Sequence, residues 1–349
     1  MDWVRGEKLG FGSFGNVNLA VPRKQSSQIT PLMAVKSCVV SQSASLMNEK
    51  LVLDELKDCS EIIRCFGESF SYENGEKLYN VLLEYASGGN LADKLKNSSD
   101  QRIPESEVRC YTKTLLKGLH YIHMVGYVHC DIKLQNILLC QDGGVKIADF
   151  GLAKRAGRKE EGVSSYELRG TPLYMSPEMV AGGKQDTPAD VWALGCVVAE
   201  MVTGTPAWRS SDLTALLMRI GVGEEVPDVP GNLSEEGKDF LEKCFVKDPS
   251  KRWTADMLLN HPFVADQDFD DTENIASTSP RCPFDFPDWA SSVTSFPSPE
   301  YSPESNFWFS SNSNLVSESR SISPEDRLLG LISHQDPDWS VSDDWITVR

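Results

Sequence analysis

The stretch Val128-His129-Cys130-Asp131-Ile132-Lys133-Leu134-Gln135-Asn136 decides how the rest of the chain is interpreted. It places an Asp, a Lys two residues later and an Asn five residues later between apolar segments that are typical of short strands. A carboxylate that orients a hydroxyl, a cation that steadies a phosphoryl group and an amide oxygen that holds a metal ion together suit phosphoryl transfer. Taken alone, the same residues are equally typical of a surface loop, so partners elsewhere in the chain must decide.

Length and charge bound the class of protein. A chain of 349 residues has room for one large domain or two ordinary ones. Its charge is uneven, because residues 266–349 hold sixteen Asp or Glu against four Arg and no Lys, which accounts for −12 of the net −17. This acidity argues against nucleic-acid binding.

The cysteines and apolar runs exclude further classes. The nine cysteines are dispersed and show no Cys-x-x-Cys spacing, so we expect neither a disulfide framework nor a zinc site, and a reducing compartment, the cytoplasm or nucleus. The longest apolar run, Val191 to Val202, is too short to span a bilayer, so it predicts a buried helix and no membrane association. No signal peptide opens the chain, and with so little sequence before Trp3 we expect no N-terminal inhibitory domain.

Three glycines near the N-terminus, Gly10, Gly12 and Gly15, follow the pattern G-x-G-x-x-G. The sequence after them predicts a strand at 16–21, whereas a dinucleotide-binding turn would need a helix. The pattern therefore favours a strand-turn-strand flap that covers phosphates, with a plain glycine-rich hairpin as the alternative.

A strand lysine and a helix glutamate form the next pair. Lys36 ends the apolar strand Met33-Ala34-Val35-Lys36, and residues 45–57 predict a helix with Glu49 inside its apolar stripe. A buried carboxylate needs a partner, and Lys36 is the expected one. The alternative is that Glu49 lies at the edge of the stripe and reaches water.

A hinge and a long helix precede the opening stretch. Residues 78–83 predict a strand, and the turn after it would leave backbone groups of Glu84 and Ala86 to bond an adenine edge. Residues 105–124 predict a helix, since apolar side chains recur there every three or four positions.

With Asp149-Phe150-Gly151 at the end of a further strand, the chain resembles the eukaryotic protein kinases. That family has a Gly-rich loop, a strand lysine, a helix glutamate, a catalytic loop and Asp-Phe-Gly in this order. Ser176-Pro177-Glu178, Asp190 to Gly195 and Arg252 extend the match, which covers roughly residues 3–263.

The resemblance implies an α+β, two-lobed protein-kinase fold. We expect a small β-rich lobe at about 3–85 and a large helical lobe at about 86–263. An acidic Ser/Pro-rich tail, 264–349, is expected to be mostly disordered.

The resemblance also implies the site residues and the cofactors, ATP and Mg²⁺. Asp131 would accept the substrate proton, Lys133 would stabilise the phosphoryl group, and Asn136 and Asp149 would hold Mg²⁺. Glu178 and Arg252 would form a buried structural ion pair. The expected nucleotide contacts are Leu9, Gly10, Phe11, Gly12, Ser13, Phe14, Gly15, Asn16, Val17, Ala34, Lys36, Glu49, Leu83, Glu84, Ala86 and Leu138.

Within the resemblance, Lys133 points to Ser/Thr specificity. The segments at 170–178 and 252–263 are similar to those of plant MEKK-like MAP kinase kinase kinases, above all the small members that begin at the kinase domain. This likeness implies MAP kinase kinases as substrates, in plant stress or hormone signalling such as that of abscisic acid. A Ser/Thr kinase outside the cascade is one alternative. A pseudokinase scaffold is another, disfavoured because Lys36, Glu49, Asp131, Lys133, Asn136 and Asp149 are all present.

Two residues depart from the family pattern. Cys130 stands where most members have an Arg that pairs with a phosphate on the activation loop, so we expect weaker dependence on loop phosphorylation. A redox role for Cys130 is the less favoured alternative to an inert thiol. Leu134 stands where Pro is common, which we interpret as a tolerated change.

Hydroxyl groups mark two candidate regulatory regions. Ser164, Ser165, Tyr166 and Thr171 lie near the basic residues Lys154, Arg155, Arg158 and Lys159, although Thr171 is expected to serve the substrate platform. The tail carries Ser-Pro at Ser279, Ser298, Ser302 and Ser323, which are candidate sites for a downstream MAP kinase. Its aromatic clusters favour docking motifs for such a kinase or other regulators, and packing on the chain's own kinase domain is the alternative.

Overall fold

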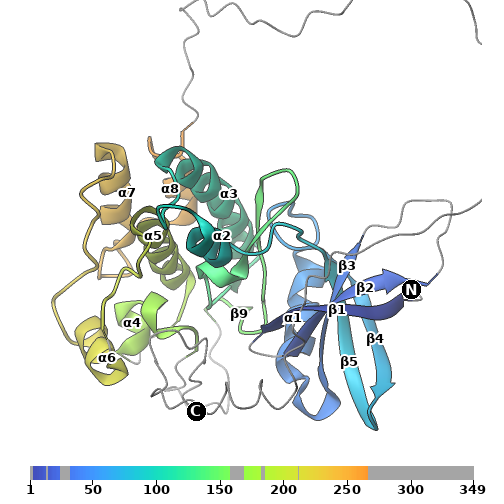
Figure 1. Ribbon diagram of the computed structural model, residues 1–349. Coiled ribbons are helices and arrows are strands. Elements are labelled where there is room, and N and C mark those ends of the chain that lie inside the picture. The colour runs from blue at the N-terminus through green and yellow to red at the C-terminus, as the bar shows by residue number, and fades with distance from the viewer. Residues whose placement is uncertain are drawn as a thin grey trace, which may run out of the picture. The chain divides into compact units, whose positions relative to one another are not determined.

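A computed structural model describes residues 3–12, 15–23, 32–157, 169–181, 185–210 and 212–265 (Figure 1). These residues belong to one compact unit. Ser13 and Phe14, the candidate phosphorylation sites at 164–166 and the whole tail from residue 266 lie outside the described residues.

The small lobe is built on an antiparallel sheet with the strand order β1-β2-β3-β5-β4. Its strands are β1 Trp3–Gly12, β2 Gly15–Pro22, β3 Met33–Val39, β4 Cys65–Glu73 and β5 Glu76–Glu84. Strand β3 lies at the centre and is buried from residue 33 to 37, as its apolar sequence favours. Lys36 therefore sits in the middle of the sheet, opposite Val17 on one side and Val81 on the other.

One α-helix packs on this sheet (Figure 1). It is α1, Ala44–Glu55, which follows the short 3-10 turn η1, Val40–Gln42. Its apolar stripe is buried, and Glu49 lies within that stripe with 1% of its surface exposed. The expected helix at 45–57 is confirmed, with bounds shifted by one or two residues.

The large lobe is mainly helical. Its helices are α2 Leu91–Asn97, α3 Glu105–Met124, α4 Pro177–Val180, α5 Thr187–Thr203, α6 Leu213–Gly221, α7 Glu235–Cys244 and α8 Ala255–Leu259. Short strands and 3-10 turns lie between them: β6 Tyr127–Val128, η2 Leu134–Asn136, β7 Ile137–Leu139, β8 Val145–Ile147, β9 Lys154–Arg155 and η3 Pro172–Tyr174. Helix α5 contains the apolar run 191–202 and is almost entirely buried, as predicted.

The lobes meet through backbone hydrogen bonds beside the catalytic loop. Ile63 donates its N–H to the carbonyl of Ile147 over 2.9 Å, and Ile147 donates its N–H to the carbonyl of Glu61 over 2.9 Å. The β-rich small lobe and helical large lobe confirm the predicted α+β, two-lobed fold. Among the described residues, no helix has the length and apolarity needed to cross a membrane.

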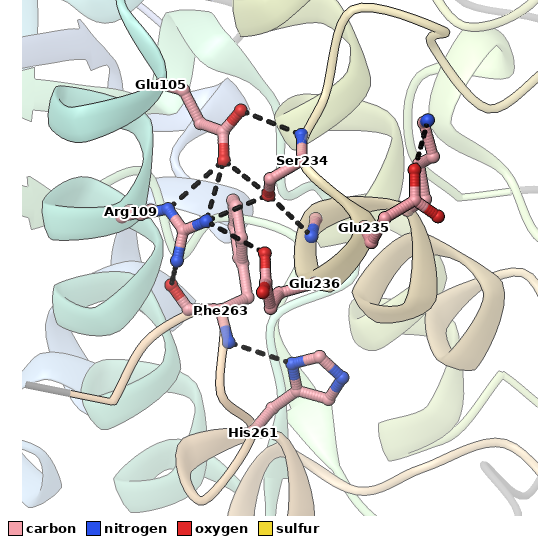
Figure 2. Close-up of polar contacts among 9 residues, drawn as sticks. Glu105, Arg109, Ser234, Glu235, Glu236, His261 and Phe263 are labelled. Atoms are coloured by element: carbon pink, nitrogen blue, oxygen red, sulfur yellow. Dashed lines mark hydrogen bonds and ion pairs between the residues drawn. The ribbon is translucent and has the colours of Figure 1, made fainter. Parts of the chain in front are cut away.

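A polar cluster fixes the last described turn to the start of α3 (Figure 2). Arg109 Nη2 donates to Glu105 Oε1 and Ser234 Oγ, each over 2.8 Å, and Nη1 donates to the carbonyl of Phe263 over 3.1 Å. The guanidinium also lies 4.7 Å from the centre of the Phe263 ring. Ser234 in turn caps α7, because its hydroxyl accepts the N–H of Gly237. One cation thus joins three separate parts of the large lobe.

Candidate active site

A single buried carboxylate holds the backbone of the catalytic loop. Asp190, near the start of α5, accepts the N–H of His129 at Oδ2 over 2.8 Å and the N–H of Cys130 at Oδ1 over 3.0 Å. The ring of His123 on α3 lies 2.9 Å from the same Oδ2. Burial alone would raise the pKa of Asp190, but the hydrogen bonds from the His123 ring and the His129 backbone help to outweigh it, and that pKa is lowered. The loop is therefore anchored to both α3 and α5.

The ring of His129 links the catalytic loop to the segment after β8 that carries Asp149. Its Nδ1 accepts the N–H of Asp131 over 3.2 Å, which assigns the ring proton to Nε2. Nε2 then donates to the carbonyl of Ala148 over 3.1 Å. The ring packs edge-on against Phe150, with centres 4.7 Å apart.

Asp131, the candidate proton acceptor, lies in a network of polar side chains. Lys133 Nζ is 2.7 Å from Asp131 Oδ2, and Asn136 Nδ2 donates to the same oxygen over 3.0 Å. Thr171 donates its hydroxyl to Asp131 Oδ1 over 2.7 Å and accepts from Lys133 over 3.0 Å. Asp131 is thus positioned to accept a proton from a hydroxyl group, with the Lys133 ammonium beside it. In this structure the hydroxyl that donates to Asp131 is that of Thr171.

Lys36 joins the two lobes through a pair of carboxylates. Its Nζ lies 2.7 Å from Glu49 Oε2 and 2.9 Å from Asp149 Oδ1. Burial opposes the charge of Lys36, but the attraction of the two carboxylates outweighs it and raises the pKa of Lys36. The predicted pairing of Lys36 with Glu49 is confirmed, and the alternative in which Glu49 reaches water is wrong.

Asn136 and Asp149 supply oxygen atoms that fit Mg²⁺. Strands β7 and β8 pair Ile137 with Ile147, and the N–H of Ala148 donates to the carbonyl of Asn136 over 2.9 Å, which brings the two candidate ligands together. The amide nitrogen of Asn136 points to Asp131, so its oxygen is the atom left to face a metal ion. One amide oxygen and one carboxylate, completed by phosphate oxygens, match the preferences of Mg²⁺.

The remaining nucleotide candidates lie on the strands of the small lobe and on β7. Leu9 to Gly12 are on β1, Gly15 to Val17 on β2, Ala34 opposite Leu83 in the β3–β5 pairing, and Leu138 on β7. Gly15 has a structural reason to lack a side chain, because a Cβ there would come within 2.3 Å of the Ser37 carbonyl oxygen.

The hinge residues differ in what they can offer a nucleotide. The N–H of Glu84 already donates to the carbonyl of Arg64 over 2.8 Å, and its carboxylate pairs with Lys146 at 2.7 Å. Of the two backbone groups of Glu84 that could bond adenine, the N–H is thus already used, and only the carbonyl is left. Ala86 lies in the connection between β5 and α2 and is half-buried.

Cys130 is an enclosed thiol. It has 6% of its surface exposed, a backbone φ of +70°, and an Sγ that lies 3.6 Å from the carbonyl of Val128. Burial raises the pKa of the thiol well above its usual range. A thiol of this kind is neither accessible nor ionised, which argues against the redox alternative.

The Glu178–Arg252 pair has the expected buried geometry. Arg252 Nη1 and Nη2 lie 2.7 and 2.9 Å from the two carboxylate oxygens of Glu178, and the Arg252 side chain has 0% exposure. Leu134 is buried in the main apolar core, which explains why an apolar residue is accepted there.

The anchoring roles of Asp190, His123 and His129 were not predicted from the sequence. Asp190 does carry a signal, since it begins an apolar helix and a buried carboxylate needs donors. Gly170 was missed as well: a Cβ at this residue, whose φ is +109°, would come within 2.6 Å of the Cys130 carbonyl oxygen. No local pattern announces that close approach.

The sequence model of the family described as protein kinase domain matches residues 3–264. The chain belongs to the protein kinase family. This kinase is 50% identical over 363 aligned residues to mitogen-activated protein kinase kinase kinase 20 of Arabidopsis thaliana, with 100% of both chains covered. It is 37% identical to mitogen-activated protein kinase kinase kinase 18 of the same plant, over 100% of this chain and 99% of that one. Its identity to kinase kinase kinase 17 is 41%, over 76% of this chain and 70% of that one.

These findings confirm the likeness to MAP kinase kinase kinases and make the protein a Ser/Thr protein kinase. Members of the family use ATP and Mg²⁺. The roles of individual residues rest on the geometry described above.

Proposed function

We propose that this kinase transfers the γ-phosphoryl group of ATP to Ser or Thr side chains of MAP kinase kinases. The observation that carries the proposal is its similarity, across the whole of both chains, to a plant MAP kinase kinase kinase. The polar groups around Asp131 and Lys36 support it, because they are assembled in a form that suits phosphoryl transfer.

Each group has a distinct part in the proposed reaction. Asp131 orients the substrate hydroxyl and accepts its proton, and Lys133 lies beside it to steady the phosphoryl group. Lys36, fixed by Glu49, is placed to bind the α- and β-phosphates of ATP. Asn136 and Asp149 would hold Mg²⁺, which would offset the negative charge of the phosphates.

Two other functions would use the same fold. A Ser/Thr kinase outside the MAP kinase cascade would share the whole site and differ only in its protein substrate. A pseudokinase scaffold is disfavoured, because Lys36 keeps its ion pair and Asp131 keeps its network.

Phosphate transfer to a panel of purified MAP kinase kinases and to a generic basic protein tests the proposal. The variant Asp131→Asn removes the proton acceptor, and Asp142→Asn is the matched control, since Asp142 lies in an exposed turn between β7 and β8. Transfer confined to MAP kinase kinases, lost in Asp131→Asn and kept in Asp142→Asn, is the expected result. Transfer to the basic protein alone would discard the cascade, and ATP binding without transfer would favour the scaffold.

We also propose a role in stress or hormone signalling, and a tail that contacts a downstream MAP kinase or another regulator. The four Ser-Pro dipeptides support the tail proposal. Replacing all four serines with Ala should lower the phosphate that a MAP kinase adds to the full chain, and an unchanged phosphate content would refute it. Comparing kinase activity recovered from plants before and after abscisic acid tests the signalling role.

The cytoplasm or nucleus is the proposed compartment, because the eight cysteines in the described part of the chain are all unpaired. Imaging a fluorescent fusion in plant cells tests this, and a secreted protein would contradict it.

A further inference from the structure

Side chains on one face of α1 bond the backbone that follows Asp149. Ser45 donates its hydroxyl to the carbonyl of Gly151 over 2.9 Å. Asn48 Nδ2 donates to the carbonyl of Ala153 over 2.9 Å, with the carbonyls of Gly151 and Phe150 at 3.3 and 3.4 Å. Ser45 and Asn48 are three residues apart and therefore share a helix face, beside Glu49.

The other end of α1 is attached to the same region. Glu55, its last residue, accepts the hydroxyl of Tyr127 over 2.9 Å and forms an ion pair with Arg155. The Arg155 guanidinium lies 4.1 Å from the centre of the Tyr127 ring, and the two residues pair across β6 and β9. Both ends of α1 are thus held while Glu49, near the middle, holds Lys36.

None of these contacts needs a phosphate group. The donors of Ser45 and Asn48 are neutral and their acceptors are backbone carbonyls. Lys50 is the one basic residue in the α1 sequence, and it forms an ion pair with Asp54 on the same helix. Cys130, on the catalytic loop, offers no cation either. The part of α1 that carries Ser45 and Asn48 is therefore placed by neutral groups that a loop phosphate would not bind.

We propose that Ser45 and Asn48 are positioning residues, which hold α1 and the Lys36–Glu49 pair in place when the activation segment, residues 149–178, carries no phosphate. Their hydrogen bonds tie Glu49 to the backbone directly after Asp149, so the two carboxylates that bind Lys36 keep their spacing. The inference rests on kinase activity but not on which protein is the substrate.

Four variants of the full-length kinase test it after phosphatase treatment and removal of the phosphatase. Asn48→Asp keeps the size of the side chain and removes the amide donor, whereas Asn48→Gln keeps a donor. Ser45→Ala removes the second donor. Lys50→Gln is the matched control, because it changes a residue of the same helix that bonds only Asp54 among the contacts of α1 described above.

Two readouts separate positioning from simple folding. One readout is steady-state kinetics, with a generic basic protein or a MAP kinase kinase as the phosphate acceptor. It gives the KM for ATP and kcat, and kcat is expressed per mole of nucleotide-binding sites so that unfolded protein is not counted. The other is amide hydrogen exchange of residues 44–55 compared with 105–124, which needs no acceptor and so stands even if the proposed substrate is wrong. Loss of one hydrogen bond to the backbone corresponds to a change of about fivefold.

The expected result is a fall in kcat of about fivefold or more for Asn48→Asp, a KM for ATP within about twofold of wild type, and faster exchange in 44–55 alone. Asn48→Gln should recover more than half of kcat, and Lys50→Gln should match wild type. Wild-type kcat and exchange in both Asn48→Asp and Ser45→Ala would overturn the proposal, as would a loss of wild-type activity on phosphatase treatment. If Asn48→Asp does not fold, kcat and exchange in Ser45→Ala decide the matter.

Discussion

Replacing Arg252 with Met is expected to destabilise the kinase much more than replacing its partner Glu178 with Gln. The Arg252 side chain is fully enclosed, at 0% exposure, whereas that of Glu178 is 12% exposed. Arg252 also donates to the backbone carbonyls of Val246 and Pro188, each over 2.8 Å, and to that of Lys247 over 3.3 Å. Losing the Arg252 guanidinium therefore breaks three hydrogen bonds to backbone carbonyls in addition to the ion pair.

The two costs can be estimated from these contacts. Arg252→Met keeps an unbranched chain that can pack on Trp192, whose ring lies 5.1 Å from the guanidinium. It leaves the Glu178 carboxylate without its partner, and removing one member of a buried ion pair costs about 3–5 kcal/mol. Glu178→Gln keeps an acceptor oxygen for Arg252, so about 1–2 kcal/mol is expected. For a domain of this size, the midpoints of thermal unfolding should fall by roughly 10 °C and roughly 4 °C respectively.

Thermal unfolding followed by circular dichroism measures both variants and the double variant Arg252→Met/Glu178→Leu. The double variant should be more stable than Arg252→Met alone, because no carboxylate is left without a partner. A midpoint for Arg252→Met within about 2 °C of wild type, or strictly additive losses in the double variant, would refute the reasoning.

Three further outcomes are expected at the active site. Thr171→Val keeps the shape of the side chain but removes the hydroxyl that bonds Asp131, the proposed proton acceptor. We therefore expect kcat to fall about fivefold, and Thr171→Ser should restore most of it. Asp190→Asn should be less stable than wild type at neutral pH. The pKa of Asp190 is lowered in the folded state, so the difference in stability between wild type and Asp190→Asn is fully present above the pKa of an unfolded Asp, about 3.9. It should vanish as the pH falls through the pKa of Asp190 in the folded state. Urea unfolding at several pH values checks this. Cys130 should resist a thiol reagent in the folded kinase and react on unfolding, while the exposed Cys110 reacts in both states, as mass spectrometry can show.

The order of the motifs was enough to predict the fold, because each motif fixes one element of the site. The buried carboxylate of Glu49 also predicted its own partner, which is observed 2.7 Å away. The same rule applied to Asp190 would have revealed a buried anion, but its donors are mainly backbone N–H groups, which are the same in every residue.

Other parts of the site could not be predicted for physical reasons. Ser45 and Asn48 are small polar residues on a helix, and their sequence looks the same whether they face water or bond the neighbouring backbone. The Glu84 N–H is unavailable to adenine because it donates to the carbonyl of Arg64, twenty residues earlier. Such contacts follow from the packing of distant segments and leave no local pattern.

The cluster around Arg109 bears on where a gene for the catalytic domain alone should place its stop codon. The Arg109 side chain is 19% exposed and relies on the carbonyl and ring of Phe263. A chain that stops before Phe263 would lose that carbonyl and that ring, and it would expose apolar side chains that the fully buried ring covers, such as Phe240. A chain that stops after Ala265 keeps them. A difference of a few codons would thus separate a preparation that stays in solution from one that aggregates.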